Sequence, residues 1–247
     1  MSIESERDRI GLERAGRVVA RILNRLKPHV RDGITTRELD AMADMWLQEE
    51  GARSAPRHVY GFPAAICISV NDEAVHGVPS ARRVRCGDLV TLDVTVEMDG
   101  YYADAAITLA VEPVSVQAEA LRRCAEAAFW QAMAVARAGV MLREIGRAVD
   151  AEVRKRGFHV LRDLAGHGIG RTIHERPAVL NYENRRDHTV LNDGLVLAVE
   201  PIVAASARRC IEMPNRWTVS SEDGGMTAHF EHTVVIGKGH PRILTAA

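Results

Sequence analysis

The chain has 247 residues, of which 47% are hydrophobic and 4% aromatic, and its formal net charge is −1. This length can bury a substantial core, while the balanced charge provides no basic face of the kind that nucleic-acid binding requires. No stretch approaches the roughly 20 apolar residues of a membrane-spanning helix. The four cysteines form no C-x-x-C pair, which is typical of reduced thiols. We therefore expect a cytoplasmic protein with neither a nucleic-acid substrate nor a membrane partner.

The first predicted elements are two amphipathic helices. Apolar residues recur at helical spacing over residues 4–26, and Pro28 follows as a stop. A second helix is expected from Thr35 or Thr36 to Gly51, because Thr35 and Glu38 have the spacing of a capping box. Both helices precede the first strand patterns.

The rest of the chain alternates between strand and helix patterns. Strand-like runs joined by a Met98-Asp99-Gly100 turn predict a β-hairpin. Helical spacing then resumes, and strands dominate the last third of the chain. The predicted strands cover residues 65–70, 88–96, 101–111, 189–203, 208–213 and 229–236, and the predicted helices cover residues 116–138 and 142–156.

The order of helix, helix and strands occurs twice. Gly33-Ile34 and Arg37-Glu38-Leu39 match Gly139-Val140 and Arg143-Glu144-Ile145 at one constant offset. A duplication would pack two halves about a pseudo-twofold axis with a site between them; chance similarity between two amphipathic helices is the alternative. Because no Pro/Gly/Ser-rich linker separates the halves, we predict a single α+β domain over residues 1–247.

Several ionisable residues lie in apolar or glycine-rich stretches. Burial of such residues is costly unless they are paired or bind a metal, and a mixed Asp/Glu/His set suits divalent cations. The pattern therefore predicts a two-metal hydrolase. The candidates are His76, Asp93, Asp104, His167, His174, Glu200 and Glu231.

Each candidate has a simpler alternative. Asp93 shares a strand face with Thr91 and Thr95 and could point at water, and Glu231 could occupy an exposed strand end. Glu200 is expected within a strand that is apolar on both faces, so a buried partner is required. The remaining histidines are expected to be structural or surface residues: His29, His58, His159, His188, His229, His232 and His240.

Other catalytic motifs do not fit. The glycines around His167 are typical of a loop that presents an imidazole, but the loop lacks the Lys-Ser/Thr of a phosphate-binding loop. His174-Glu175 resembles half of a zinc-protease H-E-x-x-H helix, yet Pro177 would interrupt that helix and Ala178 replaces the second histidine. No G-x-S-x-G nucleophile elbow is present, and none of the cysteines has a recognised nucleophile setting.

Taken together, the ordered motifs resemble the type I methionine aminopeptidases over almost the whole chain. They are Gly61-Phe62-Pro63, Asn71-Asp72-Glu73, His76-Gly77-Val78-Pro79, Asp93-Val94-Thr95, Asp104, Gly166-His167-Gly168-Ile169-Gly170, His174-Glu175, Glu200-Pro201 and Glu231-His232-Thr233. The resemblance implies a pita-bread fold, in which two pseudo-symmetric halves surround a dinuclear metal site.

The resemblance also implies a role for each site residue. Asp93 would bind one metal, Asp104 and Glu231 would bridge both, and His167 and Glu200 would bind the second. The ions would be cobalt, manganese, iron, zinc or nickel, and an activated hydroxide would attack the peptide. Glu200 would accept a proton, and two histidines would assist: His174 at the oxyanion and His76 at the scissile nitrogen.

The implied substrate is the N-terminal methionine of nascent polypeptides with a small second residue. Its side-chain pocket would be lined by Phe62, Cys67, His76 and Trp217, and His174 would also bind the substrate. The chain departs from the common family pattern at Ile173, Tyr60 and His229, which puts the pocket shape in question and leaves the implied ligands in place. The resemblance further implies a monomer that associates with ribosomes.

Two other functions remain open from the sequence. A proline-directed Xaa-Pro aminopeptidase or prolidase shares the five ligands, although those enzymes usually carry an additional N-terminal domain. A pita-bread module that only binds peptides is the other alternative, although such modules typically lack several of the ligands that are present here.

Overall fold

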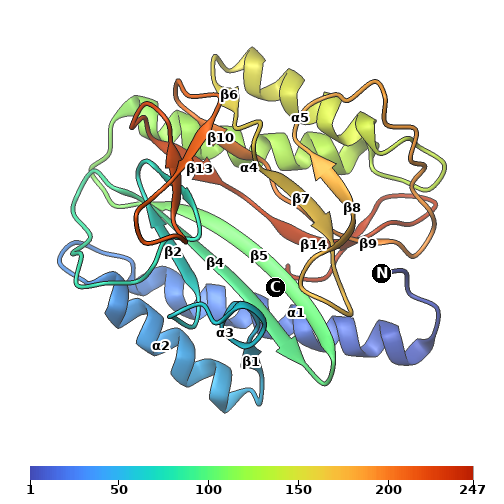
Figure 1. The fold of residues 1–247 in the computed structure, drawn as a ribbon, viewed down its shortest axis with the longest axis horizontal. Coiled ribbons are helices and arrows are strands. Elements are labelled where there is room, and N and C mark those ends of the chain that lie inside the picture. The colour runs from blue at the N-terminus through green and yellow to red at the C-terminus, as the bar shows by residue number, and fades with distance from the viewer. Residues whose placement is uncertain (247) are drawn as a thin grey trace.

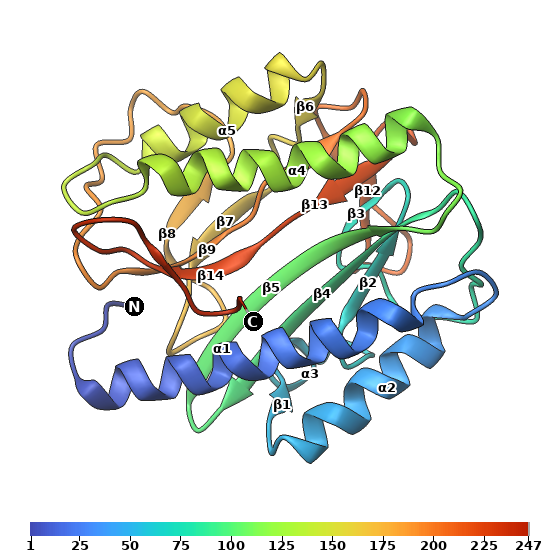
Figure 2. The ribbon, with the colours of Figure 1, turned by 180° about the vertical axis from the view of Figure 1, so that it is seen from behind.

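The computed structural model describes residues 1–246, and the long helices α1 and α4 run across one face of its strands (Figure 1; Figure 2). The helices are α1 (Glu6–Leu26), η1 (Lys27–His29), α2 (Thr36–Glu49), α3 (Ala55–Tyr60), α4 (Val116–Val135) and α5 (Arg143–Lys155). The strands are β1 (Arg53–Ser54), β2 (Cys67–Val70), β3 (Glu73–Val75), β4 (Leu89–Met98), β5 (Tyr101–Ala110), β6 (His159–Val160), β7 (Ala165–Gly168), β8 (Glu175–Leu180), β9 (Val196–Val199), β10 (Ile202–Ala204), β11 (Cys210–Glu212), β12 (Val219–Ser221), β13 (Thr227–His229), β14 (His232–Val235) and β15 (Arg242–Ile243).

The first half packs α1 and α2 against the β4–β5 hairpin. The predicted capping box at Thr35 and Glu38 is present: the Thr35 hydroxyl accepts from the Glu38 backbone, and the Glu38 carboxylate accepts from the Thr35 backbone. The predicted hairpin is also confirmed, with Asp93 opposite Ala106 and Thr95 opposite Asp104. One apolar cluster joins Leu12 and Val19 of α1 to the inner face of these strands.

The second half repeats this arrangement. Helices α4 and α5 cover a sheet in which the strand order is β15-β14-β9-β7-β8, and a separate apolar cluster joins Phe129 of α4 and Ile145 of α5 to Leu197 and Val234 of this sheet. None of the helices within residues 1–246 combines the length and apolar composition required to cross a membrane.

Equivalent turns support the duplication. Gly33 and Gly139 precede the second helix of their halves, with φ angles of 86° and 88°. The backbone N–H of each glycine donates a 2.9 Å hydrogen bond to the carbonyl oxygen of an apolar residue about 50 positions further along the chain. Gly33 donates to Val84, and Gly139 donates to Leu191. The two turns share a left-handed glycine and a long-range hydrogen bond. Chance similarity between two amphipathic helices would not produce these shared features, so they favour duplication.

The two halves are joined along a seam between β5 and residues 229–233. Glu231 and Ala106 exchange backbone hydrogen bonds of 2.9 and 3.3 Å. On one side of this pair, the Thr233 hydroxyl accepts from the Asp104 N–H and donates to the Asp104 carbonyl, both at 2.8 Å. On the other side, Thr108 makes the same double contact with the backbone of residue 229. The seam fixes the register of the two halves at the site.

Four local predictions need correction. The strand expected over residues 189–203 is interrupted at Glu200 and Pro201, which lie between β9 and β10, and the strand expected over residues 229–236 is interrupted at Phe230 and Glu231, between β13 and β14. Residues 55–60, for which no element was predicted, form the short helix α3. The glycines around His167 lie largely on strand β7 rather than in a loop, and they permit close packing: a Cβ on Gly166 would lie 2.4 Å from the Ala198 carbonyl oxygen.

Candidate functional site

A cavity of about 170 Å³ is lined by residues of both halves. All ten residues that the sequence analysis predicted for the site line this one cavity. They are Phe62, Cys67, His76, Asp93, Asp104, His167, His174, Glu200, Trp217 and Glu231.

Strand register brings the three carboxylates at the seam onto one face. Asp93 and Glu231 lie opposite Ala106 from its two sides, Asp93 through the β4–β5 ladder and Glu231 through the seam. Asp104 is two residues before Ala106 on β5, so its side chain points to the same face. Because the Ala106 side chain is small, the three carboxylates can occupy the space over this face of β5.

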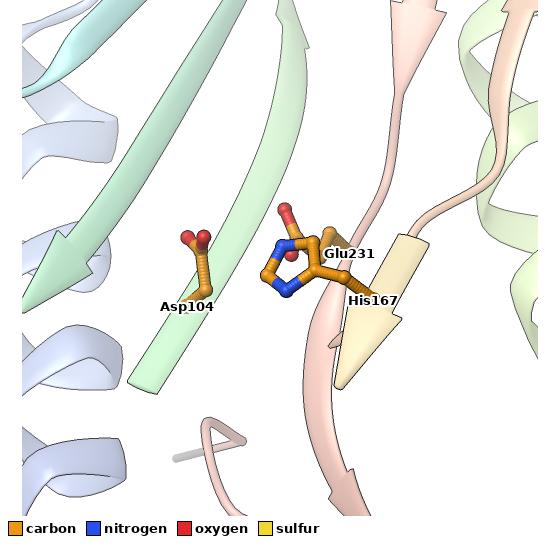
Figure 3. Close-up of side chains that lie close together, drawn as sticks. All are labelled: Asp104, His167 and Glu231. Carbon is orange, nitrogen blue, oxygen red and sulfur yellow. The ribbon is translucent and has the colours of Figure 1, made fainter. Parts of the chain in front are cut away.

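The second half supplies His167 and Glu200 in the same way. His167 of β7 lies opposite Ala198 of β9, and Glu200 follows two residues after Ala198, just beyond the strand end. Because alternate residues share a face, the imidazole and this carboxylate point toward the seam. Figure 3 shows His167 and Glu231 facing Asp104 across the gap between the strands of the two halves.

These side chains are close enough to share ions. One ligand atom each from Asp104, His167 and Glu231 lie within 4.8 Å of one another. The Nδ1 atom of His167 lies 2.9 Å from the Gly168 carbonyl oxygen, so an Nδ1–H donor there leaves Nε2 free. That Nε2 atom lies 3.6 Å from Glu200 Oε1.

The carboxylates are buried without enough donors. Asp104, Glu200 and Glu231 are 7%, 8% and 2% exposed, and among residues 1–246 no hydrogen-bond partner contacts Asp93 Oδ1, Asp104 Oδ1 or Glu231 Oε1. Buried carboxylate oxygens without donors are strongly destabilising unless a cation or a proton neutralises them. The donor set therefore fits divalent cations that accept oxygen and imidazole ligands.

Burial and mutual repulsion raise the pKa values of this cluster. Burial raises the pKa of Asp104 to about 6. Burial, followed by the charges of the neighbouring carboxylates, raises the pKa of Asp93, Glu200 and Glu231 well above the ordinary range. Without a cation, the cluster is therefore most stable when it holds protons.

The sequence predicts that His229 is a structural or surface residue; it is not a surface residue, because it is only 1% exposed. Its side chain lines the cavity, and Glu200, His229 and Glu231 form a second group whose ligand atoms lie within 4.8 Å of one another. The available signal was its position two residues before Glu231, which places both side chains on one face of an extended segment.

Two further histidines lie nearer the cavity mouth. His76 has a φ of 57°, a left-handed conformation that is uncommon for a residue with a Cβ and is often retained at functional sites. His174 Nδ1 lies 2.6 Å from the Tyr60 hydroxyl. Burial lowers the pKa of both imidazoles, which favours their neutral forms. Both can therefore exchange hydrogen bonds with a bound substrate.

An apolar pocket adjoins the carboxylates. Phe62 and Cys67 are 2% and 5% exposed and belong to one small apolar cluster, against which Trp217 packs. The Phe62 and Trp217 rings lie edge to face with centroids 5.3 Å apart. Cys67 pairs with Asp93 across the β2–β4 ladder, which places the pocket directly beside the charged cluster.

Comparison with known proteins identifies relatives over the whole chain. The sequence model of metallopeptidase family M24 matches residues 11–238. The chain is 39% identical to methionine aminopeptidase 2 of Bacillus subtilis over 247 residues, which cover 99% of both proteins. The crystal structure of a methionine aminopeptidase from Thermotoga maritima is 31% identical and superposes with a TM-score of 0.96 over 100% of both chains.

A prolidase is a more distant structural neighbour. The prolidase from Pyrococcus furiosus is 23% identical and superposes with a TM-score of 0.76. The match covers 99% of this chain but only 65% of that one. At this identity the likeness shows a shared fold alone.

The pKa values predict how the chelated protein responds to pH. A carboxyl whose pKa is higher in the folded than in the unfolded state stabilises the fold below about pH 4, and this contribution is lost as pH rises through its folded pKa. For Asp104 the folded value is about 6. In the presence of chelator, we expect the melting temperature of the wild type to fall more steeply between about pH 4 and about pH 7 than that of Asp104→Asn.

Thermal melts of both proteins across this pH range, in chelator, measure the difference directly. Asp99→Asn, which removes an exposed carboxylate from the turn of the same hairpin, is the matched control and should follow the wild type. Parallel curves for the wild type and Asp104→Asn would contradict the assignment of a destabilising charge to the buried cluster.

Proposed function

The chain belongs to the methionine aminopeptidases of metallopeptidase family M24, and from this we propose that it removes the N-terminal methionine from polypeptides by metal-dependent hydrolysis. It is a metallo-exopeptidase with the pita-bread fold, as its relatives and structural neighbours are. The observation that carries the proposal is one cavity that holds both the carboxylate–histidine cluster and the apolar pocket.

We propose that five residues hold two divalent ions. Asp93 would bind one ion, Asp104 and Glu231 would contact both, and His167 and Glu200 would bind the other. Manganese, iron, cobalt, nickel and zinc all accept such a mixed oxygen and imidazole set. When bound, the ions would lower the pKa of a water molecule and polarise the scissile carbonyl. Four carboxylates carry the charge that two divalent cations neutralise.

The protein's own groups would manage the proton and the peptide. Glu200 would accept a proton, and burial and its carboxylate neighbours support this role because they raise its pKa. If the Tyr60 hydroxyl donates to His174 Nδ1, across the 2.6 Å between them, the other ring nitrogen carries a hydrogen toward the developing oxyanion. His76 would hydrogen-bond the scissile nitrogen.

The apolar pocket would select the first side chain. Phe62, Cys67 and Trp217 offer an aromatic and sulfur-containing wall that suits the unbranched, polarisable methionine thioether. We further propose a preference for a small second residue. We further propose that residues 1–247 act as one catalytic domain, as a monomer in the cytoplasm, on nascent chains that emerge from ribosomes.

Peptide cleavage tests this function and separates it from the proline-directed alternative. Chelated protein is assayed on Met-Ala-Ser, Leu-Ala-Ser and Ala-Pro-Ala before and after addition of manganese or cobalt. We expect methionine release only with metal, and faster than cleavage of either control peptide. Preferred cleavage of Ala-Pro-Ala would assign the chain to Xaa-Pro peptidases, and no cleavage with metal bound would indicate a binding module.

Variants of the cluster separate metal binding from chemistry. Asp104→Ala and Glu231→Ala should each lose bound metal and turnover, because each removes a carboxylate that is proposed to contact both ions. His76→Ala should keep its metal while its rate falls by about 10² or more, the range for loss of a general acid or base. Asp99→Asn again serves as the control carboxylate. Metal content and rate are measured on the same preparations, and full activity of Asp104→Ala would refute the assignment.

A further inference from the structure

His229 is held rigidly at the base of the cavity. It ends strand β13, where it pairs with Ile202 of β10. On its other side the Thr108 hydroxyl accepts from the His229 N–H at 2.8 Å and donates to the His229 carbonyl at 2.9 Å. The residue is 1% exposed. The direction of its side chain is therefore fixed from both neighbouring strands.

The imidazole of His229 lacks hydrogen-bond partners. Neither Nδ1 nor Nε2 has one among residues 1–246. The Nε2 atom instead lies 3.3 Å from Glu231 Oε2 and 3.7 Å from Glu200 Oε2. A buried polar group without a partner is costly, and an Nε2 lone pair this close to ionised carboxylates would be repelled by them.

His167 and His229 have equivalent positions relative to Glu200. His167 Nε2 is 3.6 Å from Glu200 Oε1, and His229 Nε2 is 3.7 Å from Glu200 Oε2. Each histidine also forms a group of three potential ligands that includes Glu231. A cation among Glu200, Glu231 and His229 would satisfy the unpartnered nitrogen and remove its repulsion from the two carboxylates.

We propose that His229 Nε2 is a further metal ligand, which acts with Glu200 and Glu231, so that the centre contains two imidazoles. The inference rests on the proposed metal-dependent function and adds a donor that the resemblance to the family did not imply. A second neutral nitrogen donor leaves the charge of the site unchanged. It shifts the preference of the site from manganese toward cobalt, nickel and zinc, which bind imidazole more strongly.

Proton NMR of the cobalt-loaded protein counts the imidazole ligands without reference to activity. Each histidine bound through Nε2 should give one strongly shifted, exchangeable Nδ1–H signal. We expect two such signals in the wild type and one in His229→Gln. His167→Gln should also retain one signal, which keeps the test informative if His229→Gln does not fold. His232→Gln is the control, because the His232 Nδ1 atom contacts Thr245 outside the cavity.

Competition between cobalt and manganese provides a second measurement. The ratio of the cobalt affinity to the manganese affinity should fall by about tenfold in His229→Gln. The same ratio should remain unchanged in His232→Gln. One shifted signal in the wild type, with an unchanged affinity ratio in His229→Gln, would overturn the inference and leave His229 as a hydrogen-bond donor to Glu231. Methionine release from Met-Ala-Ser on the same preparations keeps the two proposals apart, since two imidazole signals without release would refute only the proposed function.

Discussion

The hydrogen-bonded seam between β5 and residues 229–233 is the constraint on which the rest of the structure depends. It pairs Glu231 with Ala106 and locks Asp104 to Thr233. A shift of one residue in this register would turn the carboxylates of one half away from those of the other. Each half brings its own helices and apolar core, so the seam is formed by two well-supported sheets and can hold like charges together.

The fixed register holds like-charged carboxylates close together, and their repulsion explains the chemistry of the site. Two unit charges about 4 Å apart repel by roughly 4 kcal/mol at an effective dielectric of about 20, and burial adds the loss of hydration. In the metal-free protein, protonation of the carboxylates removes this repulsion. The pKa values of four residues are accordingly raised: Asp93, Asp104, Glu200 and Glu231. Divalent cations would offset this repulsion more effectively than protons, because each carries two positive charges. The fold and the metal dependence thus have one physical origin.

Local patterns in the sequence predicted much of this fold, whereas the assembly of the site required more. The Thr35–Glu38 capping box and the β4–β5 hairpin follow from short-range chemistry and are present. Glu200 lies inside the strand predicted over residues 189–203 but just beyond the end of β9, because Pro201 cannot donate to a ladder. No local pattern indicates which strands of the two halves pair. The buried ionisable residues and the suspected duplication predict a shared site, whereas the role of each residue came only from family resemblance. His229 was interpreted only as a change in the pocket, because it departs from the common residue of the family.

Anomalous diffraction from crystals loaded with manganese would show whether the buried carboxylates bind metal. We expect anomalous peaks in the cavity at the seam, within bonding distance of the Asp104 and Glu231 carboxylates. Peaks only elsewhere, or an empty cluster in crystals of protein that releases methionine, would show that the buried carboxylates serve another purpose and would contradict the account.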